Sequence, residues 1–266
     1  MKTGFNKGAA RAALVAASLA FGLGLGAAWA DEDEHEDHDE GVVAFEIPAN
    51  PTRAFKLMIG AEVYDNWWET VGTEAPEGTH PAYPAAGKKK GATTWRCKEC
   101  HGWDYKGAAG AYGSGSHFTG IKGIDGMKGA DPAKIEELLR GPTHGFTEEM
   151  IPDVAMDYLA LFVSEGQEDP SAIIDAATKK VAGDAERGAA SYQTVCAKCH
   201  GPDGKWINFG SEDDPEYVGT VASGNPWEGL HKVKYGQPGG EMPALLTFDA
   251  QAIADILAYA QTLPAK

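Results

Sequence analysis

The pattern of hydrophobic and polar residues predicts a chain built from α-helices. Its clearest stretch follows residue 50, where Asn50 before Pro51 is typical of a helix start and Gly72 is placed to end the helix. Between them, apolar residues recur at three- and four-residue steps: Ala54, Leu57 or Met58, Ala61, Tyr64, Trp68 and Val71. This spacing places them on one face of a helix. We expect that face to pack on the rest of the chain.

A second pattern occurs twice, as a short helix followed by a longer amphipathic one. Each short helix begins with a capping residue before proline and ends at a glycine: Asp131-Pro132 to Gly141, and Asn225-Pro226 to Gly236. The longer helices are expected at 153–163 and 249–263, each with its apolar residues on one side. The repeat predicts an all-α protein with two similar domains, at about residues 87–166 and 183–266. Residues 167–182 link them.

The segments before the repeat differ in composition. Residues 51–86 hold the N-terminal helix and a loop rich in proline and glycine, and we expect them to pack on the first domain. Residues 31–50 start with eight acids among ten residues. A run of like charges this dense repels itself, so these residues are predicted to form a disordered acidic tail.

Residues 1–30 have the three parts of a secretory signal. Basic residues (Lys2, Lys7 and Arg11) precede a short, glycine-interrupted apolar run that ends in Ala28-Trp29-Ala30. The expected location is therefore the periplasm. An uncleaved anchor is the alternative interpretation, but the run is short for a span, and no later stretch is long and apolar enough to be one.

The chain is strongly acidic, with a formal net charge of −16. Loss of the basic signal residues would make the remainder more acidic still. Such a surface repels nucleic acid and anionic membranes, and it steers the protein toward partners that carry basic patches.

Two pentapeptides share the pattern Cys-x-x-Cys-His: Cys97-Lys-Glu-Cys100-His101 and Cys196-Ala-Lys-Cys199-His200. This is the signature of covalent c-type haem attachment, in which two thiols form thioethers to one porphyrin and the adjacent histidine ligates its iron. All four cysteines of the chain belong to the two motifs. The motifs predict two covalently bound haem c groups, with a single four-cysteine zinc site as the competing hypothesis.

With these motifs inside a helical repeat, the chain resembles the class I c-type cytochromes, specifically a tandem dihaem member. The resemblance implies that a helix leads into each motif, that a terminal helix crosses it, and that a methionine between them supplies the sixth iron ligand. The second copy follows this pattern, with Met242 in Gly239-Gly-Glu-Met242-Pro243. The resemblance leaves residues 31–86 unexplained.

The axial ligands implied for the second haem are His200 and Met242, and His101 is implied for one side of the first. On the other side the first copy departs from the family pattern. Met242 lies thirteen residues before Asp255, which begins Asp-Ile-Leu-Ala, and the residue thirteen before the matching Asp157 is His144. We therefore predict that His144 is the distal ligand of the first haem.

Met150 and His117 are the competing candidates for that position. Met150 precedes Ile-Pro and so imitates a methionine loop, whereas His117 follows a glycine-rich stretch that lets backbone approach a cofactor. His231, on the short helix of the second copy, is expected to face the surface or a haem propionate.

Two irons with ligands on both faces leave no open position for a substrate. The sequence therefore favours an electron carrier, or the cytochrome subunit of a larger complex, that passes electrons from a dehydrogenase to a downstream acceptor. The alternative is an enzyme that oxidises a small inorganic sulfur donor at the first haem. Methionine ligation raises the potential relative to bis-histidine ligation, so the first haem is expected to have the lower potential.

Overall fold

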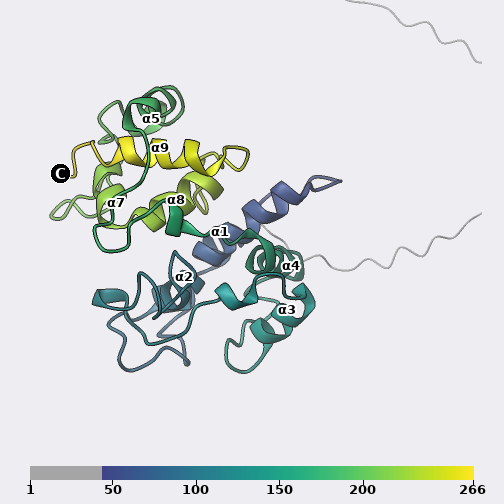
Figure 1. Cartoon of the computed structure of the whole chain (residues 1–266). Coiled ribbons are helices and arrows are strands. Elements are labelled where there is room, and N and C mark those ends of the chain that lie inside the picture. The colour runs from purple at the N-terminus through teal and green to yellow at the C-terminus, as the bar shows by residue number, and fades with distance from the viewer. Residues whose placement is uncertain (1–43) are drawn as a thin grey trace, which may run out of the picture. The chain divides into compact units, whose positions relative to one another are not determined.

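The computed structural model describes residues 44–266 and confirms the all-α fold class. The helices of this part of the chain, in order, are α1 Arg53–Val71, α2 Cys97–His101, α3 Pro132–Arg140, α4 Asp153–Leu161, α5 Ala185–Ser191, α6 Ala197–His200, α7 Val218–Gly224, α8 Pro226–Tyr235 and α9 Ala250–Ala260 (Figure 1). No β-strand occurs among these residues. Both α4 and α5 continue into one turn of π-helix, over Phe162–Gly166 and Tyr192–Cys196 respectively.

Most predicted helix ends lie where the capping signals place them. Gly72 ends α1 in a left-handed conformation, and α3 and α8 both begin at the expected prolines. The start of α1 differs from the prediction, because Thr52 rather than Asn50 caps it by accepting a hydrogen bond from the Phe55 N–H.

Helix α1 is buried on more sides than its apolar stripe predicts. From Ile59 onward it packs against α2, α4 and α8, so that its burial includes the polar residues Asp65 and Thr70. A helix enclosed on all sides shows little amphipathic pattern in its sequence. The expectation of one packed face was therefore wrong for the second half of α1.

Glycines allow close helix crossings at matching places in the two copies. A Cβ atom on Gly60 of α1 would lie 2.0 Å from the Tyr158 carbonyl oxygen in α4, and one on Gly188 of α5 would lie 1.8 Å from the Asp255 carbonyl oxygen in α9. The absence of a side chain is what lets the backbones approach this closely. Helix α1 thus crosses α4 as α5 crosses α9 (Figure 1).

A tyrosine lies one helical turn after each of these glycines, and the two tyrosines make equivalent hydrogen bonds. The Tyr64 hydroxyl donates to the Gly102 carbonyl at 2.6 Å, and the Tyr192 hydroxyl donates to the Gly201 carbonyl at 3.1 Å. Each accepting glycine directly follows a Cys-x-x-Cys-His motif. Helix α1 therefore has, in the first copy, the place that α5 has in the second.

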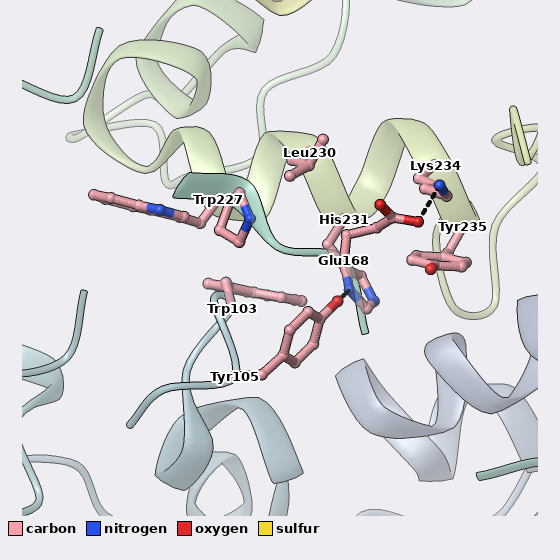
Figure 2. Close-up of a pocket in the computed structure, with 9 residues that line it drawn as sticks. Trp103, Tyr105, Glu168, Trp227, Leu230, His231, Lys234 and Tyr235 are labelled. Atoms are coloured by element: carbon pink, nitrogen blue, oxygen red, sulfur yellow. Dashed lines mark hydrogen bonds and ion pairs between the residues drawn. The ribbon is translucent and has the colours of Figure 1, made fainter. Parts of the chain in front are cut away.

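The two copies share an apolar cluster. Trp103 and Tyr112 from the loop after the first motif pack with Trp227 and Leu230 of α8 and with residues of α9. Figure 2 shows Trp103 and Tyr105 meeting the α8 side chains. The fully buried Asp65 of α1 adds an ionic link.

Asp65 pairs with Arg96 from the first copy and with Lys232 from α8. Burial alone would raise the pKa of Asp65, but these two cations lower it below its usual value. The carboxylate therefore stays charged, and it joins the two copies.

Glu62 is influenced by the charges of Asp65 and Lys232, and its ionisation should make the stability of the fold depend on pH. Burial and the charge of Asp65 raise the pKa of Glu62 to about 7, against the opposing effect of Lys232. A carboxyl with a raised folded-state pKa stabilises the fold below its unfolded pKa, and that contribution is lost as the pH rises through the folded value. Relative to Glu62→Gln, the wild type should lose on the order of 2 kcal/mol of unfolding free energy between about pH 5 and pH 8. Urea unfolding at both pH values measures this, and parallel pH profiles for the two proteins would contradict it.

The predicted signal at residues 1–30 lies outside the described part of the chain, as does the acidic run of the tail. Residues 44–50, also assigned to that tail, do pack: the Ala44 N–H donates to the Val71 carbonyl at 3.0 Å, and Phe45 lies against Phe55. Ala44 and Phe45 are therefore packed against α1 and do not belong to a disordered tail. Among residues 44–266, no helix combines the length and apolar character that a bilayer crossing requires.

Candidate functional site

Each Cys-x-x-Cys-His motif forms one short helical turn that ends at its histidine. The turns are α2 and α6, and the glycines that follow them, Gly102 and Gly201, have φ angles of 80° and 82°. A residue with a side chain adopts this conformation only at a cost. The glycine redirects the chain directly behind each histidine and presents the carbonyl that binds the tyrosine described above.

Three of the four thiols lie in surroundings that disfavour thiolates. Burial raises the pKa of Cys97 and of Cys100 to about 12, and that of Cys196 to about 11. Zinc binding requires deprotonated thiols gathered around one point. Within residues 44–266, which include all four cysteines, no three His, Cys, Asp or Glu side chains are placed to hold a metal ion. The arrangement thus disfavours the competing four-cysteine zinc site.

In the first copy the structure brings His101 and His144 together. Their ring centroids are 6.2 Å apart, at an interplanar angle of 41°. The Nδ1–H of His101 donates to the Lys122 carbonyl, and the Nδ1–H of His144 donates to the Leu138 carbonyl, both at 2.9 Å. With Nδ1 protonated, the Nε2 lone pair of each neutral imidazole is free to bind a metal.

The separation of the two rings matches a metal ion held between them. Imidazoles that ligate one metal from opposite sides, each with about 2 Å between nitrogen and metal, have ring centres roughly 6 Å apart. Burial also lowers the pKa of His101 to about 4, although its hydrogen bond to the Lys122 carbonyl acts in the opposite direction. Neutral His101 is the form that ligates.

The two competing candidates are placed differently. The Nδ1 of His117 pairs with the buried Glu99 at 2.9 Å, and its ring stacks on Tyr112 at 4.7 Å. Met150 packs half-buried against the core cluster of the first copy. Of the three, His144 is the one whose ring faces that of His101 at a distance that fits a shared metal ion.

In the second copy, His200 is half-buried at the end of α6. Its Nδ1 is buried without a hydrogen-bond partner among the described residues, its ring lies 5.8 Å from that of Phe209, and burial lowers its pKa. Met242 is half-buried on the loop between α8 and α9, with its carbonyl oxygen beside Gly236. No hydrogen bond or ring contact of the described residues joins His200 to Met242, so this pairing stays a prediction.

His231 occupies a position that the sequence did not indicate. It is 2% exposed, and it bridges the copies: its Nδ1 lies 3.0 Å from the Tyr105 hydroxyl and its Nε2 lies 3.1 Å from the Ala61 carbonyl oxygen. Figure 2 shows the ring between Trp103 and Tyr235. The expected surface or propionate-facing role was wrong, because α1 and the first copy cover this part of α8.

One protein-family model matches part of the chain. Residues 183–259 match the family model described as Cytochrome C oxidase, cbb3-type, subunit III. The match supports a c-type cytochrome. No curated protein and no solved structure matched the chain.

The matched cytochrome c segment runs from just before α5 into α9, and it contains Cys196, Cys199, His200 and Met242. Such a domain carries covalently bound haem c and has a haem electron-transfer function. The residues present fit that group, since two free thiols at the haem-attachment spacing directly precede a histidine. Burial lowers the pKa of that histidine, which favours the neutral form that ligates iron. The first copy lies outside the match. Its fit to a haem depends on the His101–His144 geometry.

Proposed function

We propose that this protein is an exported dihaem c-type cytochrome that carries electrons in the periplasm from a donor dehydrogenase to a downstream acceptor. One haem c is attached at Cys97 and Cys100, and a second at Cys196 and Cys199. The observation that carries the proposal for the first site is the His101–His144 pair, whose ring spacing fits one iron between them.

The axial ligand pairs in this proposal are His101 with His144, and His200 with Met242. Iron–porphyrin supplies one-electron exchange at a potential that its axial ligands tune. The chain contributes fixed ligand geometry, because the carbonyls of Lys122 and Leu138 hold the two histidines of the first site by their Nδ1 atoms. A fixed ligand set reduces the structural change that accompanies each electron.

The equivalence of α1 and α5 supports the tandem arrangement. Gly60 and Tyr64 repeat the roles of Gly188 and Tyr192, which lie within the matched cytochrome segment. We therefore extend the first domain back to α1 and treat residues 72–96 as a segment inserted between its first helix and its haem motif. Because the copies share buried contacts, the proposed haems would be held at a constant separation.

Charge defines the proposed partners. A net charge of −16 favours encounters with proteins that present basic patches, and redox encounters of this kind use small interfaces and rely on electrostatic steering. Association should slow as salt concentration rises, since ions screen the attraction.

The alternative function, oxidation of a small inorganic sulfur donor at the first site, needs a displaceable ligand there. His144 is held by two hydrogen bonds. Its Nδ1–H donates to the Leu138 carbonyl, and its backbone carbonyl accepts from the Nε2–H of His80 at 3.0 Å. This anchoring favours electron transfer over substrate binding at the first site.

A redox titration followed by visible absorption tests the function. Two one-electron midpoints are expected, with the lower one at the bis-histidine site, because a thioether ligand favours the reduced iron. His144→Met should raise the lower midpoint and leave the upper one in place, whereas Met242→His should lower the upper one. Two equal midpoints in the wild type, or a His144→Met variant that titrates as the wild type does, would contradict the ligand assignment.

A further inference from the structure

Residues 72–96, between α1 and α2, form a segment that the second copy lacks. Tyr64 lies 33 residues before Cys97, whereas Tyr192 lies only four residues before Cys196. The segment folds through contacts of its own, including hydrogen bonds from the Gly91 N–H to the Thr79 hydroxyl and from the Trp95 indole to the Gly78 carbonyl. At its middle lies His80, which is 8% exposed.

The hydrogen bonds of His80 fix its tautomer. Its Nδ1 lies 3.0 Å from the Ala82 N–H, which can only donate, so Nδ1 accepts and Nε2 carries the proton. That Nε2–H donates to the His144 carbonyl at 3.0 Å. The imidazole is held in place by Trp95, with 4.3 Å between the ring centroids, and by a hydrogen bond from the His80 N–H to the Thr94 hydroxyl.

The loop that carries His144 is anchored on one side by the buried Phe146, which packs on Trp67 and Trp95. Around His144 itself the other ties are few. Its backbone hydrogen bonds are local: the N–H groups of His144 and Gly145 both donate to the Gly141 carbonyl. Gly145 has a φ of 66° and is exposed, as is Thr143. The bond from His80 joins this loop to a part of the chain 64 residues away.

We propose that His80 is a positioning residue for the distal iron ligand of the first site, because its Nε2–H anchors the His144 backbone while the Leu138 carbonyl orients the His144 ring. The inference rests on the proposed ligation by His144. The inserted segment would then carry the donor that holds the loop of the proposed ligand in place.

Carbon monoxide binding to the reduced holoprotein tests this, because the gas reaches a six-coordinate iron only when the distal ligand leaves. His80→Gln keeps a donor at the place of Nε2, His80→Phe keeps the ring packing on Trp95 without the donor, and His80→Asn has an amide too short to reach. Loss of one buried hydrogen bond should make CO binding at the first site roughly five- to tenfold faster in the Phe and Asn variants. The Gln variant should bind CO at close to the wild-type rate.

His144→Ala is the reference variant, and low-temperature electron paramagnetic resonance (EPR) of the oxidised proteins is the second readout. If His144→Ala binds CO rapidly while the Phe and Asn variants of His80 bind it at the wild-type rate, the His80 inference is overturned and His144 remains the ligand. If His144→Ala leaves both the CO rate and the EPR signals unchanged, the proposed ligation itself fails. Because the Asn variant tests the same loss as the Phe variant, one of them suffices should the other not fold.

Discussion

Replacing Cys196 and Cys199 by alanine is expected to remove one of two covalently bound haem groups and to leave the other in place. Each thiol pair forms its own thioethers, and nothing in one motif substitutes for the other. The purified double variant should weigh one haem less than the wild type, and its haem absorbance per polypeptide should fall by about half. Mass spectrometry of the denatured protein measures the first quantity directly.

The matched control is the double variant of Cys97 and Cys100, which should lose the other haem to the same extent. If both double variants retain the wild-type mass, the cysteines do not attach haem. If either one loses both groups, the two motifs do not act as independent attachment sites.

Substitution of Gly188 or Gly60 by alanine is expected to destabilise the fold severely. In both cases the new Cβ would meet a backbone carbonyl at 2.0 Å or less, so the crossing helices must separate. Overpacking of this kind costs about 3 kcal/mol or more, which exceeds the gain of about 1 kcal/mol in helix propensity. Thermal unfolding of the holoprotein should shift downward by roughly 5 to 10 °C.

Gly224→Ala provides the control, since its Cβ would meet nothing within 4 Å at the end of α7. This variant should unfold at or slightly above the wild-type temperature. If Gly60→Ala behaved like Gly224→Ala while Gly188→Ala did not, α1 would not cross α4 as α5 crosses α9. The proposed first domain would then begin after α1.

The sequence predicted those parts of the fold that are encoded locally. Proline and glycine mark both ends of α3 and α8 because capping depends on neighbouring residues alone. The spacing to the last helix led to His144, and the structure brings this residue beside His101.

Features that depend on contacts between distant residues were not predicted. Helix α7 contains two glycines and little apolar periodicity, so its sequence does not distinguish it from a loop. His231 is buried by Tyr105, 126 residues away, and His80 meets His144 across 64 residues. No local pattern signals either contact, since the partners come together only when the copies and the inserted segment pack.

The central claim is that two haem irons are held by unlike ligand pairs, His101 with His144 and His200 with Met242. Low-temperature EPR of the oxidised holoprotein tests it most directly, because bis-histidine and histidine–methionine ferric haems differ in their g values. Two low-spin signals of equal intensity, one of each kind, are expected. A single signal, two signals of the same kind, or a high-spin iron with an open position would contradict it.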